Sequence, residues 1–488
     1  MSVPRSRWVM RGLLLFVLAF ANLNDIWSPD VIPNALLPFT LLRQGNVDYD
    51  EYVFRPAERR SPPEGHIAQR LDSEAYFFRA CGVSTATAPA GVPRSKGGPP
   101  APGPNDHVCS VFPPGMGFLA IPFFLPFVLR GANALDLGML LRVGHVAAAF
   151  YEVLAALLLW AVVRRLVSER AALALVLLYF LGTSVRTVSS QALWQHPGAH
   201  LAIAFALWLT VDERRLSRAR ELVAGLALGL GGVVRQTTAV AALGIAPWRR
   251  GTRILVSFSV GVAAGLLPLL AYNAVVFGAP FEQGYGAKPF DTPPLEGLAG
   301  LLVSPSRGLF VYEPWALLAL AGLVIARFAK TTRGALSERI ADLVFAWLAF
   351  VVVYATYAEW WGGRVFGPRF LDDLAPILIV GLAWGVRGGW FAYGFMRAVL
   401  WVTSLWSLVI FNAAAFVYDQ SWDTLPVNVN DDPSRLFSWS DPQWLAVLRA
   451  LPEGGAKAVV ALGLTLLALA FLARVEGIVG RRVVASAA

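Results

Sequence analysis

Long apolar stretches, separated by short clusters of arginine, recur along the whole chain. Stretches of roughly 17–25 apolar residues have the length that a helix needs to cross the hydrocarbon core of a bilayer. Basic clusters between such stretches mark cytoplasmic loops, because positively charged loops remain on that side of the membrane. The pattern therefore predicts an all-α polytopic membrane protein.

When every basic cluster is assigned to the cytoplasm, the chain makes about twelve crossings and both of its ends lie inside. The segment 219–248 is irregular, because its second half is short for a span. We expect a broken or re-entrant hairpin there, with Arg235 at its outer turn. The expected transmembrane helices lie near residues 8–24, 141–163, 170–187, 192–211, 219–234, 236–248, 253–277, 310–328, 339–358, 372–388, 392–417 and 456–474.

The first apolar segment is expected to remain as an uncleaved anchor. Residues 21–30 show no small-x-small cleavage site, and the later basic clusters fit an anchor whose start is cytoplasmic. A cleaved signal peptide is the alternative.

Composition agrees with this class of protein. Hydrophobic residues make up 56% of the chain and charged residues only 15%, whereas soluble chains carry about 25% charged residues. The net charge of +9 does not indicate nucleic acid, because the basic residues occur in clusters that set membrane orientation. The expected partner is the lipid bilayer, and no nucleic acid is expected.

The first extracytoplasmic loop is long and covers about residues 25–135. It contains an acidic stretch, a Pro/Gly-rich run and an apolar segment after Pro113-Pro114 that we expect to lie as a helix in the outer interface. The two cysteines, Cys81 and Cys109, both fall in this loop. A disulfide between them is expected in an oxidising compartment, and two independent thiols are the alternative.

The remaining outer segments divide the chain into two expected modules. Residues 1–280 form an N-terminal module that includes the loop 25–135. Residues 281–488 form a C-terminal module, whose outer loops are 278–310 (at the module boundary), 359–373 and 418–455. We expect these loops to gather carboxylates, arginines, a histidine and aromatic residues on one face of the membrane.

That inventory suits a sugar linked to a lipid phosphate. Arginines bind phosphate through paired hydrogen bonds and stabilise a departing phosphate. A carboxylate can remove the proton from an attacking hydroxyl. Aromatic rings stack on sugar faces and anchor at the interface.

Several motifs carry a resemblance to a known superfamily. They are the acidic first outer loop, the element Phe112-Pro113-Pro114-Gly115, and the segments SPSRGLFVYEP and WWGGRVFGPRFLDDLAP. Over most of residues 1–390 the chain resembles integral-membrane glycosyltransferases of the GT-C superfamily, which includes the protein O-mannosyltransferases and the aminoarabinose transferases.

The resemblance implies transfer of a sugar from a polyprenyl-phosphate donor to a cell-envelope glycan, lipid or protein. It implies inversion at the sugar carbon and an active site on the extracytoplasmic face of a bacterial cytoplasmic (inner) membrane, a bacterial origin being expected from the Ala/Arg/Gly/Leu-rich composition. A transporter or flippase for a lipid-linked saccharide is the alternative. It would need ionisable residues distributed through the membrane and access from both sides.

In this superfamily the catalytic base is an acidic residue soon after the first helix. Asp30 fits best, because it precedes an amphipathic segment, residues 34–46, that we expect to pack on the membrane. Asp25 is the alternative base. The chain lacks the acidic pair that many mannosyltransferase relatives carry directly after the first helix.

Asp48 and Asp50 are expected to bind substrate, or to hold Mg²⁺ or Mn²⁺ through oxygen ligands. A solvated turn is the alternative for both aspartates. No His/Cys ligand spacing indicates a dedicated metal site, and no cofactor is certain.

The expected ligands of the donor phosphate are arginines near the outer face, together with one lysine: Arg235, Arg307, Arg364, Arg369 and Lys288. Simple snorkelling to the interface is the alternative for Arg235. Ion pairing with Asp372 and Asp373 is the alternative for the arginines of the loop 359–373.

Three further residues are expected to contact the sugar or the acceptor: Trp194, His196 and Tyr285. His196 lies at the outer start of an expected helix. Capping or packing of that helix is the alternative role for it.

Overall fold

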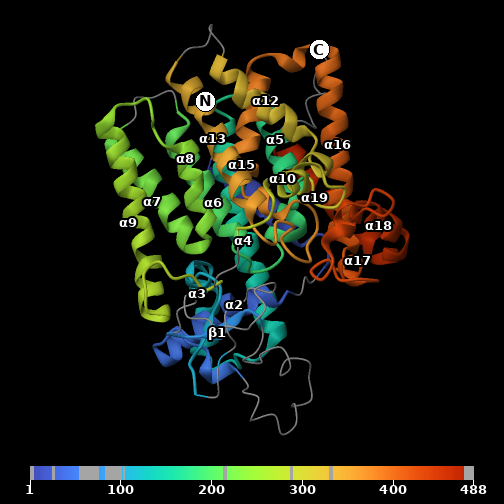
Figure 1. Cartoon of the computed structure of the whole chain (residues 1–488). Coiled ribbons are helices and arrows are strands. Elements are labelled where there is room, and N and C mark those ends of the chain that lie inside the picture. Colours follow the sequence, from blue (N-terminus) through green and yellow to red (C-terminus); the bar gives the residue numbers. More distant parts are fainter. Residues whose placement is uncertain are drawn as a thin grey trace.

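The computed structural model describes residues 5–24, 28–53, 76–82, 102, 105–212, 217–285, 290–328 and 334–476. Of these residues 73% are helical and about 1% are in strands. In Figure 1 helices α4, α6, α7 and α9 run side by side, and α2, α3 and β1 lie beneath one end of this bundle. The all-α class that the apolar pattern predicts is therefore correct.

Within the described residues, five stretches are long and apolar enough to cross a membrane. They are α4 (Leu137–Val163), α9 (Thr252–Phe277), Leu336–Thr356 within α13 (Ala335–Thr356), α16 (Gly394–Val417), and Gln443–Val475, which joins α18 (Gln443–Ala450) to α19 (Gly455–Val475). A protein with membrane-spanning helices agrees with the sequence.

The other apolar helices are shorter. They include α1 (Arg5–Phe20), α5 (Glu169–Leu181), α6 (His196–Thr210), α7 (Arg218–Val234), α8 (Ala242–Ile245), α10 (Pro294–Val303), α12 (Trp315–Phe328) and α15 (Ala375–Arg387). Each of the segments expected to cross the membrane overlaps a helix of the structure.

One large apolar core joins both expected modules. Buried residues from Leu15 in α1 to Leu472 in α19 belong to a single cluster, which includes side chains of α4, α6, α12, α13 and α15. At the edge of the bundle α7 packs closely on α9. A Cβ at Gly225 would meet the carbonyl oxygen of Phe258 at 2.1 Å, so glycine allows these two backbones their close approach.

Ion pairs hold together the helix ends that the sequence assigns to the cytoplasm. Arg11 is fully buried, and its Nε lies 2.7 Å from Glu476 while its Nη2 lies 2.6 Å from Glu169. A second group joins α7, α13 and the turn before α9 through Arg339–Glu221 and Arg249–Asp342. The expected cytoplasmic ends therefore meet in groups.

The chain breaks its helical path directly after α7. Arg235 is extended, with φ −148° and ψ 114°, and the chain turns back through a 3₁₀-helix, Gln236–Ala241, and α8. This geometry agrees with the broken hairpin expected at 219–248, with Arg235 at its turn.

The segment after Asp30 is covered by protein. All residues of α2 (Ile32–Phe39) are buried, and α2 packs against α3 (Gly115–Leu129). The prediction that this segment packs on the membrane is therefore wrong for α2. Helix α3 follows Pro113-Pro114 as expected and exposes Phe118, Leu125 and Leu129.

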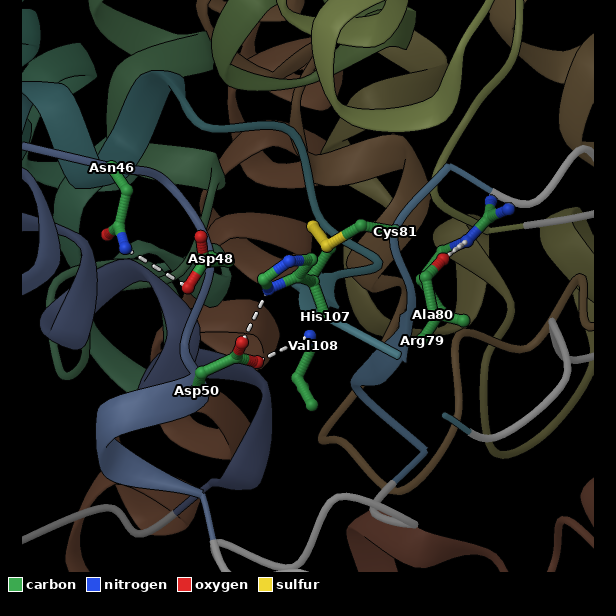
Figure 2. Close-up of a disulfide and its surroundings, with 9 residues drawn as sticks. Asn46, Asp48, Asp50, Arg79, Ala80, Cys81, His107 and Val108 are labelled. Carbon is green, nitrogen blue, oxygen red and sulfur yellow. Dashed lines mark hydrogen bonds and ion pairs between the residues drawn. A yellow bond between two sulfur atoms is a disulfide. The ribbon is translucent and has the colours of Figure 1, made fainter. Parts of the chain in front are cut away.

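A small sheet completes this end of the molecule. Strands β1 (Phe78–Ala80) and β2 (Val108–Ser110) pair antiparallel, with Arg79 opposite Cys109. Cys81 and Cys109 form a disulfide, with their Cα atoms 5.3 Å apart, as Figure 2 shows. The expected disulfide is therefore present.

Candidate functional site

Asp30 lies in a short 3₁₀ turn, Pro29–Val31, between α1 and α2. The Ser28 hydroxyl caps this turn by accepting a hydrogen bond from the Asp30 N–H at 3.4 Å. Arg369 Nη2 donates to one carboxylate oxygen at 3.3 Å, and the Tyr76 hydroxyl donates to the other. The side chain of Asp30 is 20% exposed, so this carboxylate is held by two distant segments and still reaches solvent.

Arg369 is the centre of the next contacts. It begins α14 (Arg369–Asp372), and its guanidinium carbon lies 4.3 Å from the centroid of the Trp194 ring. Nη1 donates to the Gly362 carbonyl at 3.1 Å, and Nε donates to Nε2 of His196 at 3.0 Å. The loop before α14 needs glycine, since Gly362 has φ +76°.

His196 is buried and neutral in this arrangement. Its Nδ1 lies 2.7 Å from Oδ1 of Asp373. A guanidinium N–H can only donate, so Nε2 accepts from Arg369 and Nδ1 carries the proton. Both ring nitrogens are used within the protein. The geometry therefore gives His196 a role in orienting Arg369, and its expected contact with substrate stays a prediction.

Asp373 connects this chain of contacts to Arg235. Arg235 Nε lies 2.6 Å from Oδ2 of Asp373, and Arg235 Nη2 donates to the Tyr354 hydroxyl at 2.9 Å. The Tyr354 ring stacks on Phe370, with centroids 4.3 Å apart. Positive and negative groups thus alternate from Asp30 to Arg235, which offsets the cost of burying them. We call Asp30, Arg369, His196, Asp373 and Arg235 the polar chain.

The ion pairs that were the alternative for the arginines of the loop 359–373 are absent from the described part of the chain. Neither Asp372 nor Asp373 pairs with Arg364 or Arg369 among the described residues. Asp373 instead contacts His196 and Arg235, as described above, and Asp372 accepts from the Ser184 N–H at 3.1 Å. The partner of each carboxylate is set by which helix packs against α14, and the local sequence does not show that.

Arg364 lies close enough to Tyr76 for its charge to act on the phenol. It is half-buried, and within the described part of the chain it makes no hydrogen bond or ion pair. Its charge acts on Tyr76, whose pKa is raised by desolvation and by the negative charge of Asp30, and lowered in part by Arg369 and Arg364. The phenol of Tyr76 therefore keeps its proton and remains a donor to Asp30.

Tyr285 lies near the other end of the polar chain. Its hydroxyl donates to Gln195 Oε1 at 3.5 Å, and its ring packs edge-on against Phe112 at 5.7 Å. Burial raises the pKa of Tyr285, and Arg235 opposes that shift. The structure thus brings Tyr285 toward the site, and its expected contact with the sugar or the acceptor stays a prediction.

A second set of buried polar side chains lies next to Asp372 and Asp373. His200 Nδ1 donates to Glu152 at 2.7 Å, and His200 Nε2 donates to the Asp372 carbonyl at 3.2 Å. The Tyr179 hydroxyl donates to the other oxygen of Glu152 at 3.0 Å. The sequence analysis missed this group, although Glu152, an acidic residue inside the long apolar helix α4, was a signal for it.

Arg307 lies outside the polar chain. Its guanidinium donates to Asp423, Gln443 and three backbone carbonyls, and it is only 1% exposed. These bonds use its N–H groups. The geometry therefore favours a structural role for Arg307, and phosphate binding at this residue stays a prediction without structural support.

Asp48 and Asp50 meet His107 beside the disulfide (Figure 2). One ligand atom from each of the three residues lies within 4.8 Å of the others. His107 Nδ1 lies 2.6 Å from Asp50, which also accepts from the Val108 N–H at 2.8 Å. Desolvation, and then the charge of Asp50, raise the pKa of Asp48. Neither aspartate has a bond to the polar chain among the bonds described, and a divalent cation here stays a prediction.

Asp25 and Lys288, the alternative base and the weaker phosphate ligand, lie outside the described residues. Tyr76 and Tyr354 are contacts of the site that the sequence analysis missed. Tyr76 lies in the long first loop without a periodic pattern, and Tyr354 reads as one apolar position in α13.

Fold and site together define a mostly helical protein with stretches long and apolar enough to cross a membrane, and with a chain of polar contacts that reaches solvent at an aspartate. No protein-family model, curated protein sequence or solved structure matches the chain. The resemblance to GT-C glycosyltransferases accordingly stays a prediction.

Proposed function

We propose that the protein is a membrane glycosyltransferase that moves a sugar from a polyprenyl-phosphate donor to a hydroxyl of a cell-envelope acceptor. The observation that carries this proposal is the partly exposed Asp30 carboxylate, held beside Arg369 and the Trp194 ring. A carboxylate, a guanidinium and an aromatic face are the groups that deprotonation, a phosphate leaving group and a sugar require.

In the proposed reaction Asp30 accepts the proton of the acceptor hydroxyl while that oxygen attacks the anomeric carbon. The bond from this carbon to the phosphate oxygen breaks, and its electron pair leaves with the carrier phosphate. Attack and departure on opposite sides of the ring invert the configuration, through an oxocarbenium-like transition state. Arg364, which has no partner among the described residues, and Arg369 stabilise the negative charge of the leaving phosphate.

The neutral ring of His196 keeps Arg369 in place for this step. Asp373 holds the His196 Nδ1–H, so Nε2 points at the guanidinium. Asp373 also pairs with Arg235. These groups act as positioning residues, since their polar atoms are engaged within the protein.

The proposal includes about twelve crossings, with the site on the extracytoplasmic side of a bacterial inner membrane. The ion pairs of Arg11 and of Arg339 gather the ends expected in the cytoplasm. The disulfide of the first loop supports an oxidising compartment at the opposite side, where Asp30 lies.

A transporter or flippase for a lipid-linked saccharide is the second candidate. One observation favours it: Glu152, His200 and Asp372 form a buried ionisable group inside the bundle, as a transport path would need. The enzyme remains the better proposal, because this group is bonded within the protein, whereas Asp30 is partly exposed.

The deciding experiment uses proteoliposomes supplied with a panel of polyprenyl-phosphate sugars. Wild type is compared with Asp30→Asn and with Asp106→Asn, which changes an exposed aspartate in the same loop. We expect release of carrier phosphate by wild type and the control, and its loss in a folded Asp30→Asn. Equal release by all three would move the base to Asp25 or Asp48. Lipid movement across the bilayer without release would favour the flippase.

A further inference from the structure

The side chain of Arg79 is fully buried in the small outer sheet and ties two distant segments together. Its Nη1 donates to the carbonyl oxygens of Gln283 at 2.8 Å and Gly284 at 3.3 Å. The Glu282 carboxylate lies 3.7 Å from the same nitrogen, and the ring of Phe277 lies 4.5 Å from the guanidinium carbon. A buried guanidinium is costly unless it is paired, so these contacts fix the segment after α9 against β1.

Strand β1 is anchored on its other sides as well. Cys81, directly after the strand, is bonded to Cys109, and the Gly82 N–H donates to the Val276 carbonyl at 2.8 Å. The Phe77 carbonyl accepts from the Val111 N–H at 3.0 Å. Figure 2 shows the disulfide at the end of the strand that carries Arg79.

The two segments that β1 connects both lead to the polar chain. Tyr76, three residues before Arg79, donates to Asp30. Tyr285 directly follows the carbonyl that Arg79 holds, and it lies near Arg235. Gly284 packs on the backbone of Val111, where a Cβ would meet the carbonyl oxygen at 2.1 Å. One short strand therefore places a tyrosine at each end of the polar chain.

We propose that β1 holds the site in its active arrangement only while the Cys81–Cys109 disulfide is intact. The disulfide keeps Tyr76 and Tyr285 in place, and Arg79 is a positioning residue. This inference rests on the proposed function for its effect on turnover. Breaking the disulfide frees the strand that carries Tyr76 and loosens the segment that carries Tyr285. The transfer reaction is then active only after thiol–disulfide exchange with an oxidised disulfide donor has taken two electrons and two protons from Cys81 and Cys109 and joined their sulfur atoms.

The test uses a property of the sequence: the chain has two cysteines, so a reductant has one disulfide to act on. Hydrogen exchange of peptides covering 76–82 and 281–285 is compared in oxidised and reduced wild type. The matched control replaces both cysteines, Cys81→Ser with Cys109→Ser, and the reductant should change neither its exchange nor its turnover. Arg79→Lys keeps the charge and removes the forked donors.

We expect reduction to raise exchange in both peptides and to lower kcat about tenfold or more, as misplacement of catalytic groups does. The double serine variant should behave as reduced wild type, and Arg79→Lys should raise exchange at 281–285 with the disulfide intact. Unchanged exchange at 281–285 on reduction would overturn the proposal, as would raised exchange with unchanged turnover.

The exchange measurement separates this inference from the proposed function. If oxidised wild type releases no carrier phosphate, the glycosyltransferase proposal fails, and exchange alone decides whether β1 holds 281–285. If Asp30→Asn abolishes turnover while reduction changes neither exchange nor turnover, the proposed function stands, and the proposal that the disulfide holds the site in place is wrong.

Discussion

Arg369 and Arg307 present two versions of the same chemistry, an arginine beside an aspartate. Arg307 is 1% exposed, lies 2.6 Å from Asp423 and gives its remaining N–H groups to other protein oxygens. Arg369 is 14% exposed and lies 3.3 Å from an Asp30 that is 20% exposed. We call Arg307–Asp423 the closed pair, because it is buried and fully bonded within the protein. We call Arg369–Asp30 the open pair, because its two side chains are further apart and partly exposed.

The two arginines are connected by one loop. Arg369 binds the carbonyl of Gly362, and Arg307 binds the carbonyl of the next residue, Gly363. The closed pair therefore supports the loop on which the open pair depends. A phosphate ligand must have a donor to spare, and by that criterion Arg369 and its neighbour Arg364 qualify whereas Arg307 does not.

The largest expected effect breaks the closed pair. Arg307→Gln leaves Asp423 buried without its cationic partner, and we expect a loss of about 3–5 kcal/mol in unfolding free energy. Thermal unfolding in detergent measures it. Arg369→Gln is the matched control and should lose less, about 1–2 kcal/mol, because it leaves the buried Nε2 of His196 without its donor; similar losses in both variants would remove the distinction.

The second prediction breaks the open pair. Arg369→Lys keeps the charge but loses the fork that serves Asp30, His196 and the leaving phosphate. We expect kcat/KM to fall about a hundredfold, or about 2.7 kcal/mol of transition-state stabilisation. Steady-state release of carrier phosphate measures this change. Full activity in the lysine variant would show that the fork is not needed.

The third prediction sharpens the comparison at Arg364, which has no partner to lose within the described residues. Arg364→Gln should leave stability within about 0.5 kcal/mol and raise KM for the donor about tenfold, the loss of one charged contact to phosphate. Titration of the donor in proteoliposomes measures KM. A large loss of stability instead would show that Arg364, like Arg307, is bonded within the protein.

The smallest expected effect concerns Asp48. Because burial raises its pKa, the ionised carboxylate destabilises the folded state as pH rises above the ordinary carboxyl value, and this penalty is absent in acid. Asp48→Asn should therefore stabilise the protein slightly at neutral pH, within about 0.5 kcal/mol, and leave stability at pH near 3 unchanged. Unfolding curves with excess Mg²⁺ and with EDTA extend the test. Stabilisation of wild type alone by Mg²⁺ would support a cation site at Asp48 and Asp50.

The sequence predicted what depends on local patterns and on sidedness. Helices coincide with the apolar segments, because their length and composition are local properties. Asp30, Trp194, His196 and Arg369 lie far apart in the chain but were all assigned to the outer face, and the structure brings them together.

Pairing was not predictable in the same way. Arg307 was expected to bind the donor phosphate, but Ser304 and Arg307 bond to Leu436 and Asp423, more than a hundred residues away. Tyr76 follows a loop without periodicity, so no pattern linked it to Asp30. These contacts depend on which elements pack side by side.

The buried charge of Arg11 also has a consequence for biosynthesis. Its first partner, Glu169, is made early, whereas Glu476 lies 465 residues further along the chain. A ribosome must therefore complete α19 before α1 gains its second carboxylate. Until then the nascent chain carries an incompletely neutralised guanidinium where α1 meets the bundle, and the residue after α19 completes the pairing.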